Sequence, residues 1–223
     1  MIETRYAKTI GTLTQDEANA LHGKRVCVVG CGGLGGYILE MLARIGILNI
    51  TAIDGDVFSE SNLNRQIFCT EKNIGEYKAV CAVQRIKEIN SEVKTSAHTV
   101  YLNEENAGEI LRNHDAIIDA LDNVPSRLLL EKQAERLNIP LIHGAVREWF
   151  AQIAVVMPGD RILSRLYGAS NNTSPSVPPF TPAFCASLQV SETIKLLLGK
   201  ESPARSRLVI FDLFDNSMNT FTV

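Results

Sequence analysis

Short apolar runs alternate with segments of helical periodicity through the first two thirds of the chain. Four runs have the length and composition of buried strands: residues 25–30, 49–54, 115–121 and 139–143. Three segments carry apolar residues at helical steps or open on a proline suited to a first turn: residues 33–45, 77–90 and 125–137. This alternation predicts parallel strands joined by crossover helices, which is a Rossmann-like, doubly wound α/β sheet.

The last third of the sequence departs from this alternation. It predicts a strand over residues 151–157, a helix over 183–198 and closing strands over 208–212 and 220–223. Five prolines fall between residues 158 and 182, which predicts a long crossover loop. We therefore expect a single domain with four parts: an N-terminal arm and helix (1–24), a core (25–157), the crossover loop (158–182), and a C-terminal helix with an antiparallel extension of the sheet (183–223).

Composition narrows the class of protein. The chain has 223 residues and is 45% hydrophobic, enough for one core. A net charge of −3 gives no reason to expect nucleic acid or an anionic membrane as a partner. The start of the chain is polar, no apolar run is long enough to span a bilayer, and the five cysteines lack disulfide-like spacing, so we expect a cytoplasmic protein with reduced thiols.

Residues 30–35 read Gly-Cys-Gly-Gly-Leu-Gly, the G-x-G-x-x-G pattern, between a predicted strand and a predicted helix. In such a turn Gly30 permits the sharp bend, Gly32 lets the backbone approach phosphate, and Gly35 packs the helix against the strand. The first N–H groups of the helix suit an anion. Asp54 follows the next predicted strand, where a carboxylate can bind ribose hydroxyls. The core thus predicts a nucleotide-binding unit, and the alternative is a glycine-rich turn without a ligand.

Asn62, Arg65 and Lys78 cluster after the second predicted strand, and a dinucleotide site has no use for such a cluster. Arg65 can bind phosphate oxygens bidentately, and Lys78 adds a mobile point charge. A triphosphate accounts for these groups better, so we predict ATP rather than NAD. The alternatives are a surface ion pair for Arg65 and a solvated helix lysine for Lys78.

Several motifs together resemble a known family: the glycine turn, Asp54-x-Asp56, Ser61-Asn-Leu-x-Arg-Gln66, Lys78 and Asp119-x-x-Asp122-Asn123. They resemble the ThiF/MoeB/HesA family, bacterial relatives of the ubiquitin-activating enzymes that adenylate the C-terminal glycine of small ubiquitin-like sulfur-carrier proteins. The likeness continues at residues 163–168 and 187–197, and so spans nearly the whole chain.

The resemblance implies roles for individual residues. The nucleotide contacts would be Gly30, Gly32, Gly33, Gly35, Asp54, Asp56, Ser61, Asn62, Arg65, Gln66, Lys78, Asp122 and Asn123. The catalytic residues would be Arg65, Lys78, Asp122 and Lys8, with Asp122 holding Mg²⁺. In the family an arginine near the N-terminus usually reaches into the partner subunit's ATP site, which implies a homodimer. Lys8 stands at that position here, and Arg5 is a candidate substitute. For Asp122, the residues alone leave open an N-cap of the helix that begins near Pro125.

The implied function is that of a nucleotidyltransferase. With ATP and Mg²⁺ it would activate the C-terminal glycine carboxylate of a ThiS- or MoaD-like carrier ending in Gly-Gly, and release pyrophosphate. Two alternatives stay open: a scaffold or regulatory subunit of the same fold with reduced catalysis, and an NAD-binding oxidoreductase. The resemblance does not select the carrier or the pathway.

Cysteine positions depart from the family pattern. Many members hold a structural zinc through two Cys-x-x-Cys pairs, but Gly159 and Ile162 occupy the positions of one pair here, so we predict no zinc. The crossover loop also lacks a cysteine for a covalent sulfur step, and Cys185, after it, is expected to be a small buried residue. His143, at a strand end, could face a substrate channel or be a buried, hydrogen-bonded residue.

Overall fold

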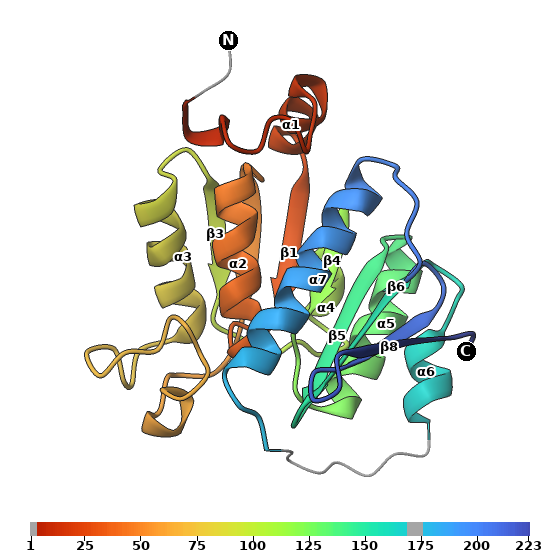
Figure 1. Cartoon of the computed structure of the whole chain (residues 1–223). Helices are drawn as coiled ribbons and strands as arrows, with labels where there is room; N and C mark the ends of the chain where they lie inside the picture. The colour runs from red at the N-terminus through yellow and green to blue at the C-terminus, as the bar shows by residue number, and fades with distance from the viewer. Residues whose placement is uncertain (1–3, 169–175) are drawn as a thin grey trace.

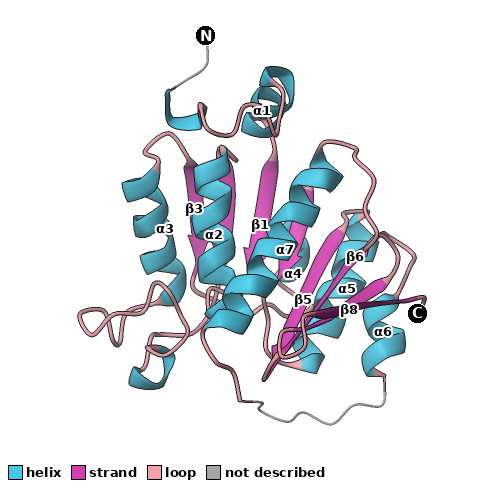
Figure 2. Ribbon diagram, viewed as in Figure 1, coloured by secondary structure: helices cyan, strands magenta, loops and turns pink. Residues whose placement is uncertain are grey.

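A single mixed sheet forms the centre of the computed structural model, which describes residues 4–168 and 176–223. Its strands are β1 (Arg25–Val29), β2 (Asn49–Ile53), β3 (Lys94–His98), β4 (Ala116–Asp119), β5 (Leu141–Arg147), β6 (Phe150–Val156), β7 (Leu208–Asp212) and β8 (Ser217–Phe221). They lie in the order β3-β2-β1-β4-β5-β6-β7-β8. The first five in this order pair in parallel and β6, β7 and β8 pair antiparallel (Figure 2). The predicted α/β sheet with an antiparallel C-terminal extension is confirmed.

Helices cover both faces of the sheet and give three layers (Figure 1). The helices are η1 (Thr4–Tyr6), α1 (Gln15–His22), α2 (Gly33–Ile45), η2 (Glu60–Asn62), α3 (Lys78–Ile89), α4 (Ala107–Leu111), α5 (Val124–Leu137), α6 (Ile162–Tyr167) and α7 (Phe180–Leu197), where η marks 3₁₀ turns. One layer holds α2, α3 and α7, and the other holds α4, α5 and α6. Within the described residues, no helix combines the length and apolar character needed to cross a bilayer.

Strand β1 contributes side chains to two hydrophobic cores, one on each face of the sheet. Its side chains alternate, so Val28 packs in the core that holds Ile38 of α2, while Cys27 packs in the core that holds Leu130 of α5. All four side chains are 1% exposed or less. Burial on both faces explains why the sequence of this strand is an unbroken apolar run.

Two helix starts follow local sequence signals. Thr14 and Glu17 form a reciprocal capping box at α1, with Glu17 N donating to Thr14 Oγ1 at 3.2 Å and Thr14 N donating to Glu17 Oε2 at 2.8 Å. At α5 the N-cap is Asn123, whose Oδ1 accepts from Ser126 N at 3.0 Å. The alternative that Asp122 is this N-cap is therefore wrong.

The predicted crossover loop over 158–182 is too long. Helix α6 occupies part of it, and α7 begins at Phe180 instead of residue 183. Buried Glu131 of α5 accepts from Leu163 N at 2.6 Å and Ser164 N at 2.9 Å, so α6 takes its cap from a distant helix. Pro182 lies in the first turn of α7, where a missing N–H costs no hydrogen bond. Residues 169–175 of the predicted loop lie outside the described residues.

Strand β3 and helix α4 were not predicted, and β8 begins at Ser217 rather than residue 220. Strand β3 is the edge of the sheet and reads Lys-Thr-Ser-Ala-His, with every side chain at least partly exposed. An edge strand with a polar sequence lacks the apolar run by which the inner strands were found.

Gly35 tolerates no side chain, because a Cβ there would lie 1.8 Å from the carbonyl oxygen of Gly30. We expect Gly35→Ala to push the start of α2 away from β1, and so to lower the midpoint of urea unfolding sharply or prevent folding. The matched control is Gly108→Ala in α4, where a Cβ would meet nothing within 4 Å. That variant should gain about 0.5–1 kcal/mol, since alanine favours helix over glycine. Equal midpoints for the two variants would contradict this account.

Candidate functional site

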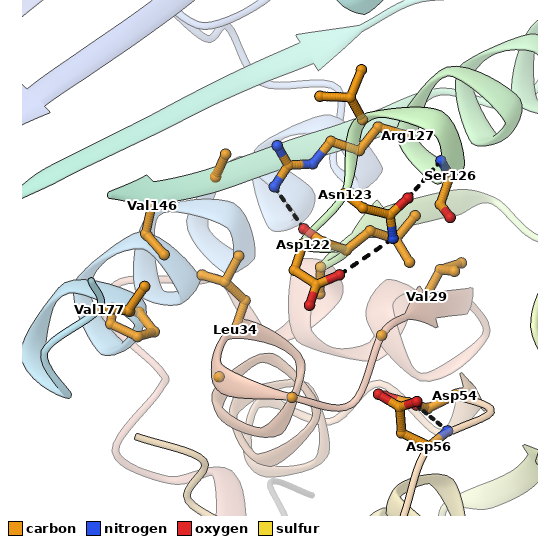
Figure 3. Close-up of a pocket in the computed structure, with 18 of the residues that line it drawn as sticks. Val29, Leu34, Asp54, Asp56, Asp122, Asn123, Ser126, Arg127, Val146 and Val177 are labelled. Atoms are coloured by element: carbon orange, nitrogen blue, oxygen red, sulfur yellow. Dashed lines mark hydrogen bonds between the residues drawn. The ribbon is translucent and has the colours of Figure 1, made fainter. Parts of the chain in front are cut away.

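A cavity of about 670 Å³ lies at the carboxyl ends of the parallel strands. From β1 the chain passes to α2 on one face, and from the neighbouring β4 it passes to α5 on the other. Such a switch point leaves a crevice between the two loops, which is where open α/β sheets bind their ligands. Gly30, Asp54 and Asp122, each just past a strand end, line this cavity (Figure 3).

The glycine turn is fixed by its neighbours on both sides. Gly30 N donates to Ile53 O at 2.8 Å, and a Cβ on Gly30 would lie 2.5 Å from Ala120 O. The positive φ of Gly30, 97°, also favours glycine. Gly32 is the N-cap of α2 and has no side chain to cap the first N–H groups of the helix. The start of this helix, Gly33 and Leu34, lines the cavity. The turn therefore has the geometry of an anion site.

Asp54 ties the glycine turn to β2. One carboxylate oxygen accepts from Cys31 N at 2.7 Å, and the other accepts from Asp56 N at 2.8 Å. Burial raises the pKa of Asp54, and these two hydrogen bonds oppose that effect. Asp54 thus has a structural role in the turn besides lining the cavity.

Lys78 and Asp56 form an ion pair at the edge of the cavity. Lys78 Nζ lies 2.9 Å from Asp56 Oδ2, and the lysine side chain is only 8% exposed, whereas that of Asp56 is 48% exposed. Tyr101 donates its hydroxyl to the other carboxylate oxygen. Burial of Asp56 acts to raise its pKa, but the hydrogen bonds from Tyr101 and Lys78 outweigh it and lower the pKa. Tyr101 follows β3, the strand that the sequence did not reveal, and no motif pointed to it.

Arg65 and Gln66 line the cavity, whereas three other predicted contacts do not: Gly35, Ser61 and Asn62. Asn62 is buried, and its Oδ1 accepts from Ser59 N at 3.0 Å, which closes the turn of η2. Arg65 Nη1 donates a hydrogen bond to the carbonyl oxygen of Ser61 at 3.0 Å. In this structure, then, Ser61 and Asn62 shape the loop that carries Arg65.

Asp122 is exposed and points toward the glycine turn (Figure 3). Its Oδ1 accepts from Asn123 Nδ2 at 3.3 Å. Gly33 also lines the cavity. Among residues 4–168 and 176–223, no group of three or more His, Cys, Asp and Glu side chains could hold a metal ion.

A polar network, which the sequence did not predict, runs from buried Asp119 and His143 to the cavity lining at Arg127, Gln152 and Tyr167. Asp119 Oδ2 accepts from His143 Nδ1 at 2.6 Å, and both side chains are fully buried. His143 Nε2 lies 3.2 Å from the hydroxyl of Tyr167 and 3.2 Å from the amide nitrogen of Gln152. Arg127 Nη1 donates to the same hydroxyl at 3.3 Å. His143 was expected either to face a substrate channel or to be a buried, hydrogen-bonded residue, and the structure shows the second.

Lys8 lies far from the cavity of its own chain. It is exposed in the segment between η1 and α1, at the amino ends of the strands, whereas the cavity is at their carboxyl ends (Figure 1). Arg5 donates to Asn90 and lies 3.4 Å from Glu92, beyond the end of α3. Neither basic residue reaches the cavity within one chain.

All five cysteines are buried and free. Cys185 lies 3.6 Å from Gln152 O, and burial raises its pKa to about 12. Burial also raises the pKa of Cys31 in the glycine turn. A thiol with so high a pKa is a poor nucleophile at neutral pH, and Cys185 is the small buried residue that the sequence predicted.

These features are typical of nucleotide-binding α/β proteins: a glycine turn with the geometry of an anion site at a switch point, an acid after the second strand, and cations in the cavity lining. The chain belongs to the ThiF family, whose family model matches residues 6–223.

Curated relatives agree with this family. The sulfur carrier protein adenylyltransferase of Thermus thermophilus is 34% identical, over 89% of this chain and 78% of the relative. The SAMP-activating enzyme E1 of Haloferax volcanii is 30% identical, over 90% of this chain and 77% of the relative. The molybdopterin-synthase adenylyltransferase of Escherichia coli is 32% identical, over 88% of this chain and 82% of the relative.

Solved structures of E. coli MccB share the fold. The complex with ATP superposes with a TM-score of 0.80 at 20% identity, over 92% of this chain. The chain spans 65% of the length of that MccB chain. At this identity, the likeness concerns the fold alone.

His143 makes stability depend on pH. Burial lowers its pKa, and the hydrogen bond to Asp119 opposes this only in part. Because the unfolded histidine, with a pKa of about 6.5, then binds protons more readily than the folded one, the stability present above that pH is lost as the pH falls. We expect the free energy of unfolding to decline from pH 7 to 5, and to decline less steeply in His143→Gln, by up to about 1.4 kcal/mol per pH unit.

Urea unfolding at a series of pH values measures both slopes. The wild type and His143→Gln should share a residual decline from His114, whose pKa burial also lowers. Identical slopes for the two proteins would contradict the buried neutral state of His143.

The buried thiols predict low reactivity. At pH 8, N-ethylmaleimide should leave Cys27, Cys31 and Cys185 unmodified in the native protein, because all three are 0% exposed. In urea the same reagent should modify all five cysteines. Mass spectrometry of digests reads each site, and rapid native modification of Cys185 would contradict its burial.

Proposed function

We propose that this chain is an ATP-dependent adenylyltransferase that activates the C-terminal carboxylate of a small ubiquitin-like sulfur-carrier protein. The observation that carries the proposal is the joint lining of one cavity by the glycine turn, Arg65, Lys78 and Asp122. The names of the curated relatives, sulfur carrier protein adenylyltransferase among them, support the same activity.

In this proposal the nucleotide lies along the glycine turn. The N–H groups at the start of α2 bind phosphate, and Asp54 binds the ribose. Arg65 binds phosphate oxygens, and Lys78 moves from Asp56 toward the phosphates, which outcompete one carboxylate for it. Gly32 and Gly33 keep this wall free of side chains.

Mg²⁺ belongs to the same proposal. This ion is commonly held by one or two carboxylates, several waters and the substrate's own phosphates, so a single exposed carboxylate at the rim fits it. Asp122 is that carboxylate, and Asn123 lies beside it. When bound, the ion neutralises phosphate charge.

The reaction needs little acid–base chemistry. A carboxylate oxygen of the carrier attacks the α-phosphorus of ATP, the bond from that phosphorus to the bridging oxygen breaks, and pyrophosphate leaves with the bond electrons. The carboxylate is already ionised at pH 7, so no base is required. The protein aligns the two substrates and offsets the charge on the leaving group. The other half of the cavity, which includes the apolar side chains of Val146 and Ile210, suits a thin, uncharged Gly-Gly tail.

Arg65→Ala tests the proposal by pyrophosphate–ATP exchange in the presence of ThiS- or MoaD-like carriers that end in Gly-Gly. Exchange should fall by about 100- to 1,000-fold, since one charged donor to the transition state is lost. The control is Arg112→Ala, an exposed arginine outside the cavity lining, which should exchange as the wild type does.

Other results of this assay separate the alternatives. If the wild type shows no pyrophosphate–ATP exchange with any such carrier, the proposed substrate class is contradicted. Binding of MgATP with no reaction that depends on Arg65 supports a scaffold. A thermal shift with NADH but not with ATP supports an oxidoreductase.

Lys8 is proposed to act in a homodimer, on the site of the neighbouring subunit. Lys8→Ala and Arg65→Ala should each be inactive alone. After the two are unfolded and refolded together, mixed dimers should regain one intact site, so about a quarter of all sites should work. No recovery on mixing would contradict action between subunits.

A further inference from the structure

Arg127 stands between the two halves of the cavity. It extends from α5, and Figure 3 shows its guanidinium directed toward the space between Asp122 and Val146. Its side chain is 10% exposed and lines the cavity. The other cation on this side, Arg147, is 65% exposed and lies near Glu148. Arg127 is thus the buried cation of the half that would receive an acyl substrate.

The guanidinium of Arg127 retains unused donors. A guanidinium has five N–H groups. Nη2 donates to Leu121 O at 2.6 Å, and Nη1 donates to the Tyr167 hydroxyl at 3.3 Å. Nε lies 3.8 Å from Asp119 Oδ2 and has no hydrogen-bond partner within the described part of the chain. One further N–H on each terminal nitrogen remains for a ligand, and such a pair matches a carboxylate.

The buried network gives the Tyr167 hydroxyl a direction of hydrogen bonding toward Arg127. Asp119 accepts from His143 Nδ1, which leaves His143 Nε2 as an acceptor. The Tyr167 hydroxyl then donates its proton to Nε2, to which the Gln152 amide nitrogen is also close enough to donate, and it accepts from Arg127 Nη1 and from the Gln152 amide. The tyrosine therefore offers Arg127 an acceptor and no competing donor, so the chain from Asp119 to Tyr167 holds the guanidinium in one place.

We propose that Arg127 binds the terminal carboxylate of the acyl substrate and directs it toward the nucleotide, and that Asp119, His143 and Tyr167 are positioning residues that hold the guanidinium. The inference rests on the proposed function, because it takes a nucleotide phosphate as the electrophile. Arg127 would bind one carboxylate oxygen while the other attacks. Among the described residues, the only other cation of the lining on this side, Arg147, is exposed and lies near Glu148, so Arg127 is the buried cation there that would recognise the negative end of the chain.

Discrimination between an acid and an amide tests this inference. A ThiS- or MoaD-like carrier is prepared with its terminal Gly-Gly as the free acid or as the C-terminal amide. Binding of each form is measured by calorimetry in the presence of a non-hydrolysable ATP analogue and Mg²⁺. The wild type should prefer the acid by about tenfold or more, as expected for a charge-assisted hydrogen-bonded pair. Arg127→Met should lose the preference but keep its affinity for the nucleotide analogue within about twofold.

Two further variants test the positioning residues. Tyr167→Phe removes the acceptor that holds Nη1 and should weaken the acid preference several-fold, whereas Tyr77→Phe, a tyrosine outside the cavity lining, should not. His143→Leu should act as Tyr167→Phe does, and His143→Gln should restore part of the preference because its amide can again accept from Tyr167. If His143→Leu does not fold, the comparison of Tyr167→Phe with Tyr77→Phe still tests whether the network positions Arg127.

The outcomes separate this inference from the proposed function. Equal affinity for acid and amide in the wild type, binding of neither form, or an acid preference that survives Arg127→Met overturns the role of Arg127. Acid preference lost in Arg127→Met, without pyrophosphate exchange in the wild type, supports the carboxylate site and contradicts adenylation. Pyrophosphate exchange in a wild type that does not distinguish acid from amide supports adenylation and contradicts the carboxylate site.

Discussion

The close meeting of three strand ends at Gly30 is the constraint on which the rest of the site depends. The backbone of the glycine turn is held by β2 through Ile53 O and Asp54, and it lies so near Ala120, just beyond β4, that a Cβ could not fit. Because β1 and β4 lead to helices on opposite faces, this point is also where the sheet opens. These contacts at the glycine turn together fix the start of α2, the place of Asp54 and the floor of the cavity.

The features that depend on local sequence were predictable. The inner strands, the helix starts at Thr14 and near Pro125, and the glycine turn each carry a signal within a few residues. The features that depend on distant partners were not. Helix α6 takes its cap from Glu131 of α5, and β3 is a polar edge strand. For the same reason the sequence favoured a long loop where the structure has a helix.

The candidate site divides in the same way. The half proposed for the nucleotide is built from motifs that are continuous in sequence, so Arg65 and Lys78 could be predicted as site residues from the sequence, and the structure places both in the cavity lining. Its other half depends on Arg127, His143 and Tyr167, which come from three elements and meet only in the folded sheet. His143 was expected at a strand end but lies within β5, and its sequence is the same whether it faces a channel or a carboxylate, so only the position of Asp119 resolves its role.

Mass spectrometry of the reaction products tests the central claim most directly. The protein is incubated with MgATP and a carrier that ends in Gly-Gly, and both the carrier and the nucleotides are analysed. The account predicts a carrier that has gained one AMP at its C-terminal carboxylate, with pyrophosphate released. Formation of ADP and phosphate, or an unmodified carrier beside intact bound ATP, would contradict it.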